Sequence, residues 1–100
     1  MTFDEFQKVI EATYGARDGA RPVTTNFTWL VEEVGELAKA LRKCERAELL
    51  HEFSDVLAWT ATVASQLGIR LEDAIQRYAE GCPKCHESPC NCPNTNREAK

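Results

Sequence analysis

The sequence predicts an all-α protein, a four-helix bundle followed by a short cysteine-rich tail. Three observations support this. Apolar residues recur at helical spacing through the first 81 residues, no segment alternates as a strand does, and three of the four prolines follow residue 82. Of the 43 hydrophobic residues, 38 lie in the first 81. We therefore expect a helical domain over residues 1–81, a separate tail over 82–93 and a disordered C-terminus over 94–100.

Each helix has its own sequence signals. Residues 2–5 read Thr-Phe-Asp-Glu, which is a capping box that opens the first helix. The second helix is predicted to begin after the polar cluster at 24–26 and to run to about residue 43, and the third to run from about 46 to 67 with Gly68 as its C-cap. A shorter fourth helix is predicted over 71–80. The apolar stripes expected to face inward are Phe3, Phe6, Val9 and Ile10; Leu30, Val34, Leu37, Ala38 and Leu41; Leu49, Phe53, Val56, Leu57, Thr60, Val63 and Ala64; and Ala74, Ile75 and Tyr78.

The junction between the second and third helices decides the topology. Residues 43–46 contain neither glycine nor proline, so a single helix of more than 40 residues is the alternative. Helices of that length are rare in globular domains, and we therefore predict a hairpin that reverses near Cys44.

Charge and hydropathy exclude several classes of protein. The net charge of −4 argues against a general nucleic-acid-binding protein, which normally carries a basic face. No apolar run approaches the length of a membrane span, and the first residues lack the pattern of a signal peptide. We expect a cytoplasmic protein in a reducing environment, where clustered cysteines more often hold a metal than form disulfides.

Two pairs of acidic residues stand out by their spacing. Glu33 and Glu36 are three residues apart, as are Glu52 and Asp55, so each pair shares one side of its helix. In a hairpin centred on Cys44, Glu36 becomes level with Glu52, and Glu33 with Asp55. Four converging carboxylates repel one another unless a cation such as Mg²⁺ joins them. A solvated acidic face, paired with nearby lysines such as Lys39, is the alternative that spacing alone leaves open.

Two tryptophans favour a nucleotide site. Trp29 and Trp59 are each fifteen residues from Cys44, so the hairpin brings them level, about one turn beyond the carboxylates. Carboxylates that hold Mg²⁺ beside flat aromatic rings suit a nucleotide, with phosphates on the metal and the base against an indole. Filling the bundle or a subunit interface is the alternative role for either ring. His51 adjoins Glu52 but points away from its face, and we assign it a surface role.

These residues resemble a known family. The segments Glu-Glu-Val-Gly-Glu-Leu at 32–37 and Glu-Phe-Ser-Asp-Val-Leu at 52–57 are similar to the paired acidic signature of MazG-like nucleotide pyrophosphohydrolases. The resemblance implies an all-α bundle, a homodimer or homotetramer, and Mg²⁺-dependent hydrolysis of nucleoside triphosphates to the monophosphate and pyrophosphate. It implies that Glu33, Glu36, Glu52 and Asp55 bind Mg²⁺, and that Glu32 either supports these ligands from outside the coordination sphere or helps orient the attacking water. Trp29, Trp59 and Lys39 are the candidate substrate-binding residues.

The tail carries a second candidate metal site. Cys82, Cys85, Cys90 and Cys92 place four thiols within eleven residues, a pattern that suits tetrahedral Zn²⁺. A redox or disulfide element is the alternative, and His86 could replace one cysteine. Four cysteine ligands leave no open position, so the predicted zinc is structural. Cys44 is left over, as a plain residue at a helix end.

Two other functions remain open at this point. A phosphoribosyl-ATP pyrophosphatase shares similar helices and acids, and a non-enzymatic zinc-knuckle adaptor would use the acidic helices to bind a basic partner. The leading prediction is the Mg²⁺-dependent enzyme, because binding a basic partner does not require four carboxylates aligned within one turn. We expect a nucleotide substrate and no nucleic-acid or membrane partner.

Overall fold

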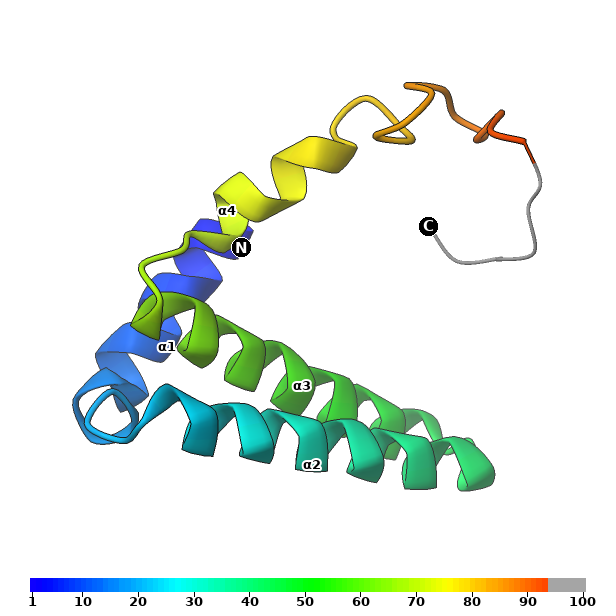
Figure 1. Ribbon diagram of the computed structural model, residues 1–100. Coiled ribbons are helices and arrows are strands. Elements are labelled where there is room, and N and C mark those ends of the chain that lie inside the picture. Colours follow the sequence, from blue (N-terminus) through cyan, green and yellow to red (C-terminus); the bar gives the residue numbers. More distant parts are fainter. Residues whose placement is uncertain (94–100) are drawn as a thin grey trace.

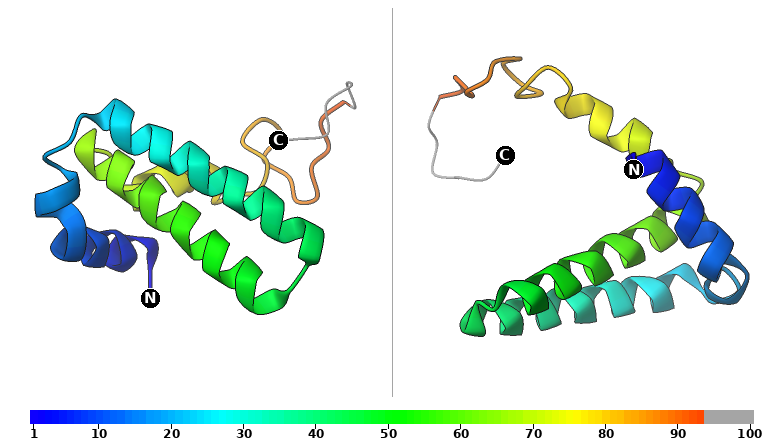
Figure 2. Two further views of the ribbon diagram at one scale, coloured as in Figure 1. Left: turned by 90° about the horizontal axis from the view of Figure 1, so that it is seen from below. Right: turned by 180° about the vertical axis from the view of Figure 1, so that it is seen from behind.

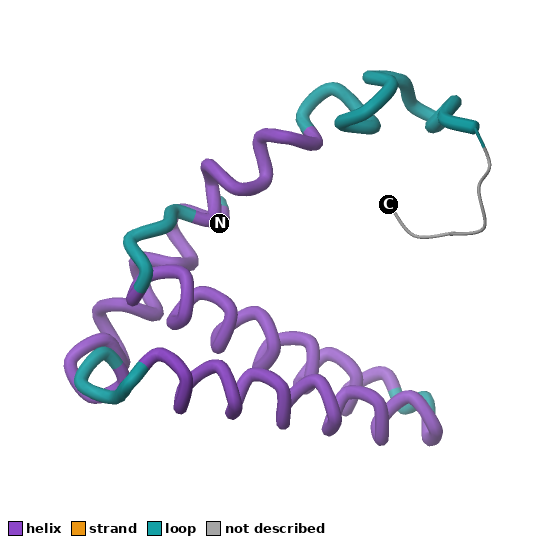
Figure 3. Tube along the Cα trace, in the orientation of Figure 1, coloured by secondary structure: helices purple, strands orange, loops and turns teal. Residues whose placement is uncertain are grey.

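The computed structural model describes residues 1–93 and is built from helices and loops (Figure 1, Figure 3). The elements in chain order are α1 (Phe3–Asp18), α2 (Val23–Lys43), α3 (Arg46–Gln66), α4 (Leu71–Ala74) and a short 3₁₀ helix, η1 (Ile75–Tyr78). No strand occurs among the described residues, and the all-α prediction is confirmed. The prediction for residues 94–100 lies outside the described residues.

Helix α1 begins as predicted. The Thr2 side chain accepts a hydrogen bond from the Glu5 backbone N–H, and the Glu5 carboxylate accepts one from the Thr2 N–H, so both halves of the capping box are present. Helix α2, in contrast, begins at Val23 and not after the 24–26 cluster. Pro22 precedes it with φ −58°, and because proline has no N–H to satisfy and a fixed φ, it starts the helix earlier than the polar residues suggest.

Helices α2 and α3 form the predicted antiparallel hairpin (Figure 2). The reversal occurs at Cys44, which has φ 57° and ψ 36° and whose N–H bonds to the Ala40 carbonyl. A single left-handed residue therefore ends α2 where the sequence has no glycine. The alternative of one continuous helix is wrong. At the other end of α3, Gly68 takes φ +70° one residue after the C-cap, so it supplies the left-handed turn expected there.

The fourth helix is shorter than predicted. The α-helical part ends at Ala74, η1 follows to Tyr78, and residues 79–81 are turns and a bend. Residues 73–80, which include the predicted inward positions Ala74, Ile75 and Tyr78, are all exposed. Short helices are marginal in water, and beyond the first turn, which contacts α1, the exposed segment tightens to 3₁₀ geometry.

Helix α1 lies across one end of the hairpin, beside the C-terminal part of α3, and the opposite end of the hairpin projects free (Figure 2). A buried amide connects α1 to the segment that follows α3. Gln7 is fully buried; its amide nitrogen donates to Ser65 Oγ (3.0 Å) and to the Ile69 carbonyl (2.9 Å), and its amide oxygen accepts from the Leu71 N–H (2.8 Å). Arg70 adds ion pairs to Asp4 (2.7 Å) and Glu11 (2.9 Å).

Much of the predicted core is exposed. Among the described residues, the buried hydrophobic side chains are Ile10, Ala40, Ala61 and Ala64, and only one of these is larger than alanine. The prediction that both hairpin stripes face inward throughout is wrong, since a single pair of helices covers only one face of each. The predicted inward positions that are exposed in the first three helices are Phe3, Val9, Val34, Ala38, Leu41, Phe53 and Leu57.

None of the helices within residues 1–93 combines the length and the apolar character needed to cross a membrane.

Candidate functional site

The centre of the hairpin seam holds a carboxylate where an apolar residue would normally pack. From Leu30 to the end of α2, the residues that are not exposed are Leu30, Glu33, Leu37 and Ala40, which follow one another at intervals of three and four. This spacing marks the face of a helix that packs against a neighbour. Glu33 therefore lies within the seam itself, whereas Glu32 and Glu36 are exposed beside it.

Three other carboxylates act on Glu33. The pKa of Glu33 lies above the usual value because partial burial disfavours its charge and because Asp55, Glu52 and, least, Glu36 repel it; hydrogen bonding from the Trp59 indole acts in the opposite direction. The hairpin thus brings the two acidic pairs into electrostatic contact, as the counting from Cys44 predicts.

Among the described residues, a close group of potential ligand atoms forms on α3, and neither Glu33 nor Glu36 belongs to it. One potential ligand atom from each of His51, Glu52 and Asp55 lies within 4.8 Å of the other two. His51 Nε2 is 3.2 Å from Asp55 Oδ2, although its own side chain is largely exposed. The i, i+4 spacing of these two residues was the signal for this contact, and the prediction of a simple surface role for His51 missed it.

The two tryptophans meet one turn away. The rings of Trp29 and Trp59 have centroids 5.4 Å apart and are nearly perpendicular, so the hairpin places them level as expected. The guanidinium of Arg21 lies 4.5 Å from the centroid of Trp29. One side of Trp29 is therefore covered by Arg21, and its neighbour Trp59 is the ring that faces an open space.

That space is a cavity of about 180 Å³ between α1 and α3, lined by Tyr14, Arg17, Asp18, Asp55, Ala58, Trp59 and Thr62. It joins Asp55 of the acidic pair on α3 to an indole and to three side chains of α1. Sequence reasoning missed Tyr14 and Arg17, because only the tertiary position of α1 brings them here. Arg17 lies 5.2 Å from the Tyr14 ring and pairs with the buried Asp18 at 3.0 Å.

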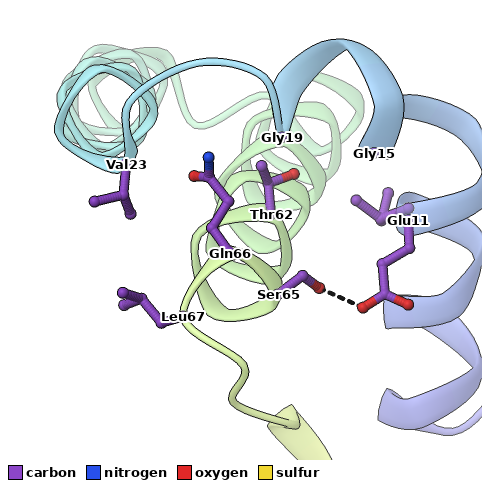
Figure 4. Close-up of a pocket in the computed structure, with 9 residues that line it drawn as sticks. Glu11, Gly15, Gly19, Val23, Thr62, Ser65, Gln66 and Leu67 are labelled. Atoms are coloured by element: carbon purple, nitrogen blue, oxygen red, sulfur yellow. Dashed lines mark hydrogen bonds between the residues drawn. The ribbon is translucent and has the colours of Figure 1, made fainter.

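A larger cavity, of about 490 Å³, lies on the other side of Thr62, between α1, the start of α2 and the end of α3 (Figure 4). Its one carboxylate, Glu11, is already engaged by the Ser65 hydroxyl at 2.6 Å and by Arg70. No member of the acidic cluster lines it. The candidate site is therefore the smaller cavity beside Asp55.

A comparison with family models identifies this arrangement. Residues 21–88 match the model described as the MazG nucleotide pyrophosphohydrolase domain. The chain belongs to the MazG family. The matched segment contains the whole hairpin, both acidic pairs and both tryptophans, whereas α1 lies before it and Cys90 and Cys92 lie after it. Comparison with curated proteins gave no match.

The donor set of this MazG domain fits a hard divalent cation. Every member of the cluster other than His51 offers carboxylate oxygens, the ligands that Mg²⁺ prefers, and the mutual repulsion felt by Glu33 is the penalty that a cation relieves. Lys39, a candidate substrate-binding residue, lies 4.0 Å from Glu36, and both side chains are exposed. The solvated pairing considered for Lys39 is therefore present, at the edge of the cluster.

The cysteine tail of the MazG chain forms a separate cluster. The sulfur atoms of Cys82, Cys85, Cys90 and Cys92 all lie within 4.8 Å of one another, and none forms a disulfide. Backbone N–H groups lower the pKa of Cys82 to about 6, while hydrogen bonding and the neighbouring sulfurs raise that of Cys92 to about 12. His86 lies outside this group, and Cys44 remains at the C-cap of α2.

Proposed function

We propose that the protein is a Mg²⁺-dependent nucleoside triphosphate pyrophosphohydrolase that releases pyrophosphate and a nucleoside monophosphate. The observation that carries this proposal is the placement of Glu33 within the hairpin seam, against the carboxylates of Asp55 and Glu52. A charge in that position destabilises the bare hairpin, so its presence is best explained by a bound cation. Membership of the MazG family supports the reaction class.

In this proposal, Glu33, Glu36, Glu52 and Asp55 hold the metal, two from each helix. Mg²⁺, when bound, neutralises the triphosphate and lowers the pKa of a bound water. Glu32 is exposed on α2 beside the seam, where its carboxylate accepts a hydrogen bond from the attacking water and orients it. A second ion, Zn²⁺, is proposed for the tail, with no part in this reaction.

The base is proposed to enter the cavity beside Asp55 and to pack against Trp59. Trp29 supports that ring from behind, and Tyr14 and Arg17 close the cavity from α1. A volume of about 180 Å³ is smaller than the cavities that enclose drug-sized ligands, which begin near 300 Å³. The cavity therefore suits one part of a nucleotide, with the phosphates outside it on the carboxylates.

A second copy of the chain is proposed to complete the molecule. On α2, a stripe of exposed residues has the same four-and-three spacing as the residues that face α3, and α3 carries a second exposed stripe with this spacing. The large hydrophobic side chains of the two stripes are 44–59% exposed. These residues are Phe27, Val31, Val34, Ala38 and Leu41 on α2 and Leu50, Phe53 and Leu57 on α3. The radius of gyration, 16.0 Å, exceeds the roughly 13 Å of a compact 100-residue domain. Pairing two hairpins through these stripes gives a four-helix bundle.

The test is pyrophosphate release from a panel of ribo- and deoxynucleoside triphosphates, with and without Mg²⁺. We expect Mg²⁺-dependent turnover that falls at least 100-fold in Glu52→Gln, since removing a metal ligand costs more than the 10–100-fold typical of its outer-shell partners. The matched control is Glu80→Gln, the same chemical change at an exposed residue outside the hairpin. If phosphoribosyl-ATP is the only nucleotide hydrolysed, the protein is a phosphoribosyl-ATP pyrophosphatase instead. If no nucleotide is hydrolysed and the protein binds a basic partner in a salt-sensitive way, the enzyme proposal is wrong and the protein is an adaptor.

A further inference from the structure

The cysteine-rich tail has a defined fold although it contains no helix or strand. Within residues 82–93, the chain turns back on itself: the Cys82 N–H donates to the Glu87 carbonyl (3.0 Å), and the His86 N–H donates to the Cys82 carbonyl (2.6 Å). Gly81 has φ +91°, and a Cβ placed there would lie 2.8 Å from the Glu87 carbonyl oxygen, so only glycine fits this approach. His86 takes φ 61° at the turn.

This fold brings four sulfur atoms to the spacing of a tetrahedral metal site. Cys82 and Cys92 sulfurs are 3.6 Å apart, and those of Cys85 and Cys90 are 3.9 Å apart. A disulfide requires about 2.05 Å. Around a tetrahedral ion with metal–sulfur bonds of about 2.3 Å, the sulfurs are separated by about 3.8 Å. The two observed distances lie on either side of that value.

Backbone amides point at three of the four sulfurs. The Lys84 N–H donates to Cys82 Sγ (3.4 Å), the Asn91 N–H to Cys85 Sγ (3.2 Å) and the Cys92 N–H to Cys90 Sγ (3.4 Å). Hydrogen bonds of this kind stabilise thiolates and fix their direction, as the outer-shell partners of a metal site do. The turns of the tail are therefore arranged around the sulfurs, not around an apolar core.

Nothing else in this segment explains why it folds. Between Gly81 and Pro93 the hydrophobic residues are the cysteines themselves, and segments of this size need a disulfide or a metal to be stable. We propose that Cys82, Cys85, Cys90 and Cys92 bind one Zn²⁺ ion as a closed tetrahedral site that folds the tail. Thiolates select zinc over Mg²⁺, so the two proposed metal sites of the chain do not compete for one ion.

His86 is excluded from the ligand set by its position. Its ring is not among the atoms that cluster, and its contribution is the backbone N–H and the left-handed φ that reverse the chain after Cys85. The site therefore has four sulfur ligands and no position for water or substrate, which makes the ion structural. The binding free energy is then free energy of folding for the tail.

The experiment measures bound metal by elemental analysis of the full chain, purified under reducing conditions and loaded with zinc, and then records the visible spectrum after Co²⁺ replaces the zinc. We expect one zinc per chain and the spectrum of a tetrahedral four-thiolate cobalt site. Cys85→Ser should weaken zinc binding at least tenfold. Cys44→Ser, the matched control at an exposed cysteine outside the group, and His86→Ala should leave zinc content and spectrum unchanged.

Three results would overturn the proposal: less than half an equivalent of zinc after loading, iron bound in its place, or equal zinc retention in Cys85→Ser and Cys44→Ser. A changed cobalt spectrum in His86→Ala would also contradict the four-sulfur ligand set. Far-UV circular dichroism of each variant shows whether α1 to α3 remain folded, so that a loss of zinc is assigned to the tail. Nucleotide turnover is measured separately, and its absence leaves the zinc proposal unaffected.

Discussion

Replacing Glu52 by glutamine should stabilise the protein without metal and remove the stabilisation that Mg²⁺ provides. Glu52 and Asp55 place carboxylate oxygens within 4.8 Å of each other, and both side chains are half-buried. Two unit charges at that distance repel by about 1 kcal/mol in water and about 3 kcal/mol at an effective dielectric constant of 20. We expect Glu52→Gln to raise the unfolding free energy in EDTA by about 1–2 kcal/mol, since the pair is only partly shielded from solvent.

Magnesium should offset most of this difference. With free Mg²⁺ at ten times its dissociation constant, binding stabilises the native protein by about 1.4 kcal/mol. The assay is urea denaturation followed by circular dichroism, in EDTA and in Mg²⁺, at one protein concentration. The unchanged chain should gain stability from Mg²⁺, Glu52→Gln should gain little, and Glu80→Gln should behave as the unchanged chain does. If Glu52→Gln is less stable than the unchanged chain in EDTA, the carboxylates do not repel and the reasoning about the cluster is wrong.

Three further predictions follow from individual residues. Folding raises the pKa of Glu33, so between pH 4.5 and the folded pKa the folded protein holds a proton that the unfolded chain has lost. The unfolding free energy in EDTA should therefore fall as the pH rises through this range. Glu33→Gln should remove this fall, and a variant with the same pH profile as the unchanged chain would contradict the prediction. Gln7→Met should cost about 3 kcal/mol in urea denaturation, because it removes three hydrogen bonds of a buried amide, each worth about 1 kcal/mol, whereas Gln76→Met at an exposed glutamine should change little. Gly35→Ala should add about 1 kcal/mol of stability in thermal unfolding of the dilute protein, since no atom lies within 4 Å of the new Cβ, and a loss would refute this.

The hairpin could be predicted because its signals are either local in the sequence or follow from the number of residues between each position and Cys44. Helical periodicity locates α2 and α3, and equal distances from Cys44 place Trp29 level with Trp59, as their 5.4 Å separation confirms. What the sequence does not indicate is which of two apolar stripes faces the partner helix. Val34 and Leu41 have the spacing of a core stripe, yet the seam runs through Leu30, Glu33 and Leu37, and a carboxylate in that row gives no hydrophobic signal.

The contribution of α1 was unpredictable for a different reason. Tyr14 and Arg17 join the cavity only because α1 crosses the end of the hairpin, and that crossing depends on the buried amide of Gln7 and not on any periodic pattern. The shortened fourth helix has a related cause. Its apolar residues predict a helix, but helical length is decided by packing, and residues 73–80 are exposed although α4 begins against α1.

The hydrogen bonds of Gln7 also hold the backbone at the point where the chain leaves the hairpin. They hold the backbone on both sides of Arg70, at Ile69 and at Leu71, which is the point where the chain leaves α3 and sets out toward the tail (Figure 1). The start of the segment that follows α3 is therefore held by the first helix, 62 residues earlier in the sequence at the Ile69 contact. The N-terminal helix, which lies outside the matched MazG segment, therefore holds the point from which the chain continues to the cysteine tail.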